Sequence, residues 1–214
     1  VRYELKEQGI YLEAEADFSK DTRPRPDSNA PRLWKEEIYD GVYMNRRLFW
    51  NPKWLVEVFV VQADRPHQID WVMHFNGQAC KTPETAAVSP FSQNPPFCFL
   101  EKMRPLAASQ ELINTYQTQD IYTTIYASQQ NHHLYQGLGP GNPSDEKITY
   151  LIERTSGKQA IFCHLIEIRK DTPTIENVKF DLTGKDATIR IKEKQKTILL
   201  QMKDQLPIQI TEIN

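Results

Sequence analysis

The stretch 67–77, HQIDWVMHFNG, gathers residue types that can bind metals, transfer protons or hydrogen-bond to sugar hydroxyls. Its two histidines, His67 and His74, lie seven residues apart. Side chains on a β-strand alternate between the two faces, so an odd separation sends the two imidazoles to opposite faces. From an unbroken strand they cannot hold one ion together, and the sequence predicts no metal site here.

The same alternation predicts one apolar and one polar face for this strand. Asp70, His74 and Asn76 share the polar face, where they could form a platform for sugar hydroxyls. Arg46 or Arg154 would add positive charge to that platform if their strands are neighbours. The residues could equally contact a partner domain or simply face solvent, because polar alternation is usual in half-buried strands.

The remaining histidines give no catalytic pattern. His132 and His133 are adjacent on an expected strand, so their rings should point to opposite faces. His164 is in phase with Phe162 and Ile166, which favours a hydrogen-bonded histidine in the core or at an interface. The chain has no GxSxG, P-loop, GxGxxG or HExxH motif, so we assign no catalytic residue.

Composition and charge exclude several classes of protein. The 214 residues are 39% hydrophobic and 25% charged, as in globular proteins, and the net charge of −2 lacks the basic excess of nucleic-acid binders. No run approaches the ~20 apolar residues of a membrane span. Cys80, Cys98 and Cys163 include no CxxC pair, so we expect buried thiols or one incidental disulfide and neither zinc nor any other cofactor.

Turn signals between period-two segments predict an all-β protein with little helix beyond one or two turns within 106–114. Residues 54–61, WLVEVFVV, are apolar at nearly every position, which indicates a strand buried on both faces. Thr155-Ser156-Gly157 reads as a hairpin turn between strands 147–155 and 158–169, and a turn is expected at 64–66. Further strands are expected at 2–7, 10–17, 33–50 (two strands), 66–77, 111–117, 120–128, 131–138, 174–182, 186–192, 195–203 and 206–213, with loops at 19–32 and 83–97. About a dozen or more strands predict a large antiparallel, supersandwich-like β-sandwich forming a single domain over 1–214.

Three passages together resemble the C-terminal β-sheet region of heparinase II/III-like polysaccharide lyases. They are YDGVYMNRRLFWNPKWLVEVFVVQAD at 39–64, HQIDWVMHFNG at 67–77, and GLGPGNP at 137–143 followed by YLIERTSGKQAIFCHLIEI at 150–168. The resemblance covers most of residues 1–182. It implies a β-sandwich that follows a helical toroid in enzymes that cleave acidic polysaccharides, including glycosaminoglycans and alginate, by β-elimination.

The chain also departs from that family. The catalytic groups and zinc ligands of such lyases come from the toroid and from a His-x-His motif, and this sequence has neither. The resemblance therefore implies a non-catalytic part of a longer, periplasmic or secreted protein, and the start of the chain in strand-like sequence at Val1 fits that expectation. Its partners would be an acidic polysaccharide or the upstream toroid, and not nucleic acid or a membrane.

Two other functions stay open on the sequence alone. The chain could be a stand-alone carbohydrate-binding module, in which exposed Trp34, Trp50 or Tyr135 would stack on sugar rings. It could also be a structural module for assembly, which would show a large exposed apolar face.

Overall fold

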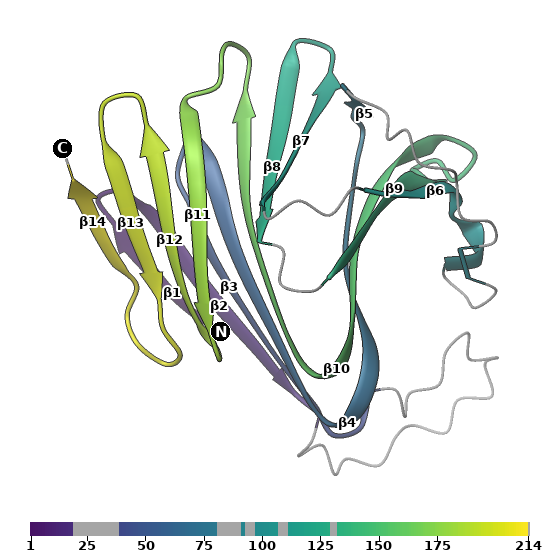
Figure 1. Ribbon diagram of the computed structural model, residues 1–214, viewed down its shortest axis with the longest axis horizontal. Helices are drawn as coiled ribbons and strands as arrows, with labels where there is room; N and C mark the ends of the chain where they lie inside the picture. Colours follow the sequence, from purple (N-terminus) through teal and green to yellow (C-terminus); the bar gives the residue numbers. More distant parts are fainter. Residues whose placement is uncertain (19–38, 81–90, 93–96, 107–110, 129–131, 214) are drawn as a thin grey trace.

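The computed structural model describes residues 1–18, 39–80, 91–92, 97–106, 111–128 and 132–213. The described residues form a ten-stranded sheet and a four-stranded sheet, both antiparallel throughout, which confirms the expected all-β sandwich (Figure 1). Apart from a short 3-10 turn at Phe97–Phe99, the described elements are strands, and none of them is a helix able to cross a membrane.

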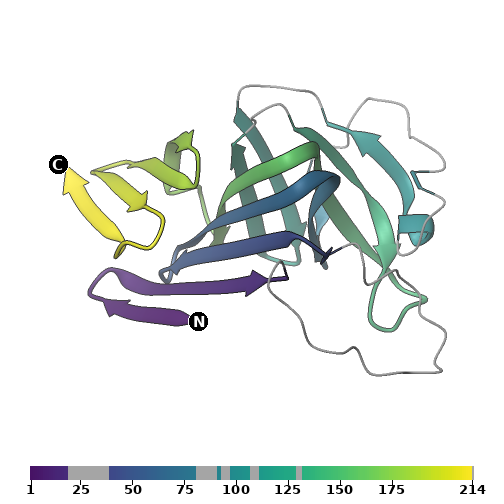
Figure 2. The same cartoon turned by 90° about the horizontal axis from the view of Figure 1, so that it is seen from below.

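The large sheet contains the first ten strands and the small sheet the last four. The large sheet has the order β1-β2-β3-β4-β10-β8-β7-β5, with β9 beside β10 and β6 beside β9. Figure 2 shows the β1–β2 hairpin at one edge of it. The bounds of its strands are β1 Arg2–Lys6, β2 Gly9–Asp17, β3 Val42–Trp50, β4 Trp54–Phe75, β5 Gln78–Ala79, β6 Glu101–Pro105, β7 Glu111–Thr118, β8 Ile121–Ser128, β9 His133–Pro140 and β10 Lys147–Arg169. The small sheet runs β11 Ile175–Thr183, β12 Asp186–Glu193, β13 Thr197–Met202 and β14 Gln209–Ile213, close to the strands expected there.

Strands β4 and β10 are unusually long and bend together. They pair from Trp54 opposite Glu167 to Phe75 opposite Thr149, and the register shifts between Gly157 and Gln159. The predicted hairpin at Thr155-Ser156-Gly157 and the predicted turn at 64–66 are therefore wrong. Each pair of expected strands is one continuous strand, because β4 and β10 pair with each other on both sides of the bend and neither folds back on itself (Figure 1).

The bend divides the large sheet into two arms. The inner arm contains β4 up to Ala63 and β10 from Gln159, with β1–β3, β7 and β8. The outer arm contains the remaining halves of β4 and β10, with β9 and β6. The small sheet packs on one face of the inner arm, where Val58 and Leu165 meet Ile189 and Leu200 of that sheet. The outer arm packs on the other face, so the molecule has three layers.

Burial on both sides explains the composition of residues 54–61. Val56, Val58 and Val60 face the small sheet, while Leu55, Phe59 and Val61 belong to the core between the two arms. Each burial removes apolar side chains from water, which stabilises a layered fold by roughly 25 cal/mol per Å². The prediction of a strand buried on both faces is confirmed.

The strand with the HQIDWVMHFNG sequence alternates as predicted. Ile69 and Trp71 are buried between the arms, whereas Gln68, Val72 and His74 are exposed on the far side.

The cysteines and the region 106–114 differ from what the sequence predicts. Cys80 and Cys98 are exposed and only Cys163 is buried, with all three thiols free. The possible helical turns at 106–114 do not reach 111, where β7 begins; 107–110, the loop at 19–32 and Trp34 lie outside the described residues.

A buried arginine joins the small sheet to the inner arm. The side chain of Arg47 on β3 is fully buried. Its Nη1 donates to the Met202 carbonyl at 2.8 Å, and its Nη2 donates to the Lys185 carbonyl in the β11–β12 turn. These bonds satisfy two backbone acceptors at the end of the small sheet that an apolar side chain would leave without a donor.

Candidate functional site

A cluster of polar side chains interrupts the apolar core between the two arms. We call it the interarm cluster, and its members are Arg46, Glu57 and His164 of the inner arm, Trp71 and Glu153 of the outer arm, and His132 just before β9. Strand alternation brings these side chains together, because the faces of the two arms that meet carry them. Buried polar groups are tolerated when they are hydrogen-bonded to one another, and this cluster is bonded in that way.

One half of the interarm cluster surrounds Glu57. Trp71 Nε1 donates to Glu57 Oε2 at 3.0 Å, and Arg46 Nε pairs with Glu57 Oε1 at 3.0 Å. The Arg46 guanidinium also lies 4.6 Å from the centre of the Phe59 ring, a cation–π contact. Glu57 is nearly buried while Arg46 is half exposed, so the guanidinium reaches from the buried carboxylate to the surface.

The other half surrounds Glu153, a carboxylate at 1% exposure. His164 Nε2 is bonded to its Oε2 at 2.7 Å, and His132 Nδ1 is bonded to its Oε1. Burial raises the pKa of Glu153, but the hydrogen bonds from His132 and His164 together outweigh burial and hold the pKa below its ordinary value. The carboxylate is therefore ionised at neutral pH and only accepts, so we assign the bonded N–H groups to the two imidazoles.

A first hollow lies beside the Arg46 end of the cluster. We call it the arm hollow; its volume is about 400 Å³. Arg46, Gln68 and Asp70 provide charged and amide groups, and Phe59 and Trp71 provide aromatic surface. The rest of its lining consists of Tyr39, Val42, Met44, Val61, Ala63, His67, Ile69, Val72 and Phe97. Apolar walls with a few polar groups are typical of small-ligand sites.

The structure brings together some of the predicted site residues and separates others. Asp70 and Arg46 line the arm hollow, but Asp70 is already bonded to Arg154 through both carboxylate oxygens, at 2.7 and 2.9 Å. The Arg154 guanidinium is covered in turn by Phe91, at 4.4 Å from the ring centre. Such a bidentate pair fixes two neighbouring strands and leaves little capacity for a ligand.

His74 and Asn76 do not join this hollow. The His74 ring stacks on Tyr150 with centres 5.2 Å apart, and Asn76 lies at a separate polar depression next to Cys80. The sixth predicted residue, Trp34, is outside the described residues. Tyr135, one of the aromatic residues proposed to stack on sugars, packs against Phe91.

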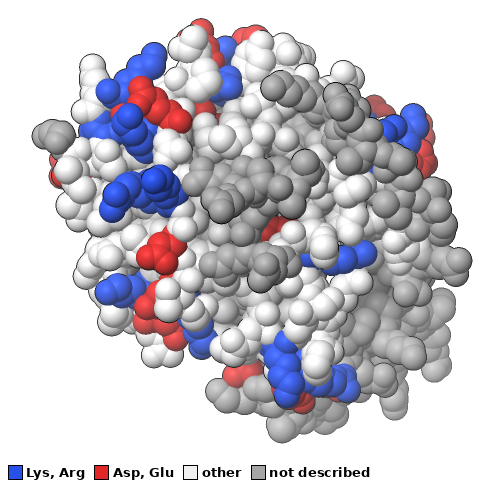
Figure 3. All heavy atoms as spheres, in the orientation of Figure 1, with Lys and Arg blue, Asp and Glu red and all other residues white. Residues whose placement is uncertain are grey.

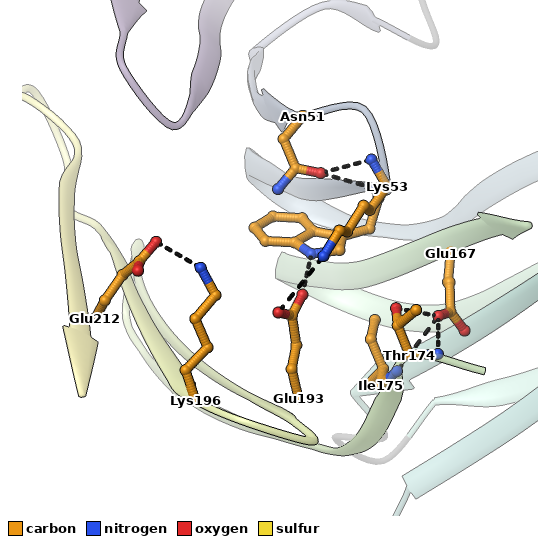
Figure 4. Close-up of polar contacts among 9 residues, drawn as sticks. Asn51, Lys53, Glu167, Thr174, Ile175, Glu193, Lys196 and Glu212 are labelled. Carbon is orange, nitrogen blue, oxygen red and sulfur yellow. Dashed lines mark hydrogen bonds and ion pairs between the residues drawn. The ribbon is translucent and has the colours of Figure 1, made fainter. Parts of the chain in front are cut away.

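A second hollow opens between the two sheets near the β1–β2 turn (Figure 4). Both of its lysines are paired with glutamates. Lys196 bonds to Glu212 at 2.8 Å, and Lys53 pairs loosely with Glu193, which also accepts from Trp54 Nε1 at 3.4 Å. These contacts, like the turn held by Asn51, tie the ends of strands together, so the arrangement is structural.

A third hollow of about 400 Å³ lies at the bend of β4 and β10, next to the β11–β12 turn. We call it the bend hollow. It is lined by Val60, Gln62, His132, Thr155, Ser156, Gln159, Ala160, Ile161, Gly184 and Lys185. The interarm cluster thus has one end at the arm hollow, through Arg46, and the other at the bend hollow, through His132.

On the face drawn in Figure 3, the described residues give no extended field of one sign. On the face in Figure 3, basic and acidic side chains are interspersed. An anionic ligand would need a local site rather than the average potential, since exposed charges are screened beyond ~10 Å. Within the described ranges, no group of three or more His, Cys, Asp or Glu side chains could hold a metal ion.

No model of a known protein family matches the chain, and no curated protein matches its sequence. The site must therefore be judged on its geometry alone.

The sequence alone does not indicate the central feature, which is the link between His132, Glu153 and His164. Glu153 lies in a strand pattern next to Arg154, and nothing local separates it from a solvent-facing glutamate. The expectation of a hydrogen-bonded core histidine is correct for His164, which is fully buried and bonded to Glu153. The sequence does carry a signal for Glu57, which interrupts the apolar run 54–61. An acidic residue at such a position needs a buried partner, and here it is Trp71.

Proposed function

We propose that the chain is a non-catalytic β-sandwich module of a polysaccharide lyase-type protein, which forms one wall of a cleft for an acidic polysaccharide and braces a separate catalytic module. The observation that carries the proposal is the arm hollow. The Arg46 guanidinium in its lining can bind a carboxylate or sulfate group, and the Gln68 amide can hydrogen-bond to hydroxyl groups. Aromatic surface from Phe59 and Phe97 suits the apolar face of a sugar ring.

The carboxylates at and beside the arm hollow are already paired, which supports the non-catalytic part. Asp70 is paired with Arg154, and Glu57 is paired with Arg46 and Trp71. Each carboxylate is thus committed to a structural partner rather than to a substrate proton. His67 lines the hollow, but its Nε2 is buried and without a hydrogen-bond partner. It lacks the carboxylate or carbonyl that normally orients a catalytic imidazole.

Calorimetric titration with uronate oligosaccharides from heparin and alginate tests the binding. We expect weak binding that Arg46→Gln reduces by about fivefold or more, the loss expected for one exposed charge contact. Arg46→Lys keeps the charge next to Glu57 and serves as the matched control, with most of the affinity retained. Equal binding by Arg46→Gln and the parent chain would refute the assignment of the arm hollow.

The same oligosaccharides test for catalysis. Incubation with the pure chain should not increase the ultraviolet absorbance of unsaturated uronate. Turnover that survives purification to homogeneity would overturn the non-catalytic proposal, whatever the binding result.

An apolar surface favours assembly as a second candidate function. Tyr3, Leu5, Ile10 and Trp50 are exposed on one face of strands β1–β3, because Leu5, Ile10 and Trp50 are direct cross-strand partners. Monomeric proteins rarely expose contiguous apolar patches of this kind. If a second copy covers the patch, light scattering will show a dimer that Leu5→Lys dissociates. A monomer at all concentrations would exclude this candidate.

A further inference from the structure

The bend hollow differs from the other hollows in the charges of its lining. Among the described residues, its polar side chains are the amides of Gln62 and Gln159, the hydroxyls of Thr155 and Ser156, His132 and Lys185, and none of these is a carboxylate. The hollow between the two sheets, in contrast, is lined by three glutamates. A lining with donors and cations but no acid is complementary to a negatively charged ligand.

The interarm cluster determines the charge at the base of this hollow. Glu153 is ionised and buried, and a buried carboxylate needs a positive partner. Two imidazoles contact Glu153, so one additional proton on either ring would balance the negative charge of the carboxylate. Which imidazole carries that proton is decided by the second nitrogen of each ring.

His164 is the poorer place for the extra proton. Its ring is fully buried, and its Nδ1 has no hydrogen-bond partner. A proton on His164 Nδ1 would be a buried, charged N–H group without an acceptor. The free-energy cost of that group is higher than the cost of leaving the Nδ1 lone pair without a donor. His132 keeps 6% of its side chain exposed and lines the bend hollow. Its Nδ1 is held by Glu153, so a proton on Nε2 is the one that a ligand can reach.

We propose that the bend hollow is an oxyanion-binding site, in which the His132 imidazolium, oriented by Glu153, and the Lys185 ammonium hold a carboxylate, sulfate or phosphate group, with Thr155 and Ser156 donating hydrogen bonds. The site is distinct from the arm hollow and does not depend on the polysaccharide proposal. The Glu153 carboxylate lies behind the imidazole and faces the core, so it orients the donor without repelling the ligand.

The backbone of Lys185 is held in place by a hydrogen bond from the core, in addition to the salt bridge of its side chain. The Lys185 carbonyl accepts from buried Arg47, which fixes the β11–β12 turn against the inner arm. The Lys185 ammonium lies 4.9 Å from the centre of the Tyr43 ring and is loosely paired with Asp204 at 3.5 Å. A partly exposed pair of this length is weak, so an oxyanion can compete with Asp204 for the lysine.

Titration of the full chain with sodium sulfate, against sodium chloride at equal ionic strength, tests the site. Sulfate should raise the unfolding midpoint with a saturating dependence on its concentration, on top of the gradual rise that an excluded salt gives any folded protein, because a ligand that binds only the folded state stabilises it. Glucuronate and inorganic phosphate form two further arms, which distinguish a sugar carboxylate from a free inorganic oxyanion. A rise in the unfolding midpoint that saturates with none of the three oxyanions would overturn the proposal.

Two surface variants locate the site without disturbing the core. Lys185→Met should weaken the sulfate effect about fivefold, as expected for loss of one exposed charge. Lys170→Met is the matched control, because Lys170 also pairs with an aspartate, Asp120, and lies just past the end of β10, away from the bend. Equal losses in the two variants, or no loss in Lys185→Met, would show that sulfate acts elsewhere.

A nitrogen NMR spectrum of the histidine side chains tests the role of His132 directly. We expect the His132 Nε2 signal to be that of a protonated nitrogen and to shift on addition of sulfate, while the signals of exposed His74 and His133 stay in place. His132→Gln should abolish the sulfate effect; if that variant does not fold, the Lys185→Met titration and the NMR shift decide. A His132 signal indifferent to sulfate would refute the proposal.

Discussion

The indole ring of Trp71 lies flat against the imidazole ring of His164, with ring centres 3.7 Å apart and planes inclined by 19°. Trp71 comes from the outer arm and His164 from the inner arm, so this stack joins the two arms of the folded sheet. It also joins the two halves of the interarm cluster, because Trp71 donates to Glu57 and His164 is bonded to Glu153.

Trp71→Phe tests the polar contact within the stack. Phenylalanine retains an aromatic ring but leaves the buried Glu57 without one donor, so we expect a loss of about 1–3 kcal/mol in the free energy of unfolding. Urea denaturation followed by circular dichroism measures it. Trp50→Phe, at an exposed tryptophan, should change stability by less than about 0.5 kcal/mol. Equal effects in the two variants would contradict the role of Glu57.

Glu153→Gln tests the buried carboxylate. Burial raises the pKa of Glu153, and its two imidazole partners lower it further than that, so the folded pKa lies below the unfolded one. The carboxylate therefore stabilises the fold above its unfolded pKa, and this contribution is lost as the pH falls through the folded pKa. At neutral pH the variant should be about 3–5 kcal/mol less stable, the cost of breaking a buried pair.

The difference between the parent chain and Glu153→Gln should narrow in acid. Urea midpoints measured from neutral to strongly acidic pH check this, with Glu212→Gln at an exposed pair as the control. A gap that stays constant over the whole range would show that Glu153 is not ionised in the folded protein.

Thiol reactivity distinguishes the three cysteines. Cys80 and Cys98 are exposed, and Cys163 is buried in the core under the small sheet. Burial, and to a lesser extent the charge of Glu153, raises the pKa of the Cys163 thiol well above its ordinary value. We expect alkylation of Cys80 and Cys98 in the native protein and of Cys163 only after unfolding, as mapped by peptide mass spectrometry. Rapid native labelling of Cys163 would contradict this packing.

Arg47→Lys tests the link between the inner arm and the small sheet. A single ammonium group cannot reproduce the fork that reaches both the Met202 and the Lys185 carbonyls, so we expect a loss of about 2 kcal/mol or more. Arg190→Lys, at an exposed position of β12, is the control and should be nearly neutral. Identical unfolding curves for Arg47→Lys and the parent chain would mean that the two carbonyls find other donors.

The sequence predicts those parts of the fold that depend on local alternation. The separation of Ile69 and Trp71 from Gln68 and His74 follows from the period of two, and burial decides it. The hairpin at Thr155-Ser156-Gly157 fails because small and polar residues occur in bends as well as in turns. Only the pairing of β10 with β4 on both sides of Gly157 distinguishes the two cases, and this long-range pairing leaves no local signal.

The polar contacts were less predictable for the same reason. Asp70 and Arg154 were each identified as candidates, but their bidentate pair depends on a register between strands 84 residues apart. The sequence indicates no role for His132, because its partner Glu153 and its neighbour Phe162 come from a strand that begins 15 residues later, at Lys147.

The shared bend of β4 and β10 also means that no boundary in the backbone separates the two arms into independent units. The same two backbones run through both arms, and their ladder continues on either side of the bend, so neither arm can melt while the other keeps its strands intact. Amide hydrogens of Val60 and Ile152, on opposite sides of the bend, should therefore exchange with solvent through the same global opening. The folded sheet would behave as one all-or-none unit, despite its outline of two lobes.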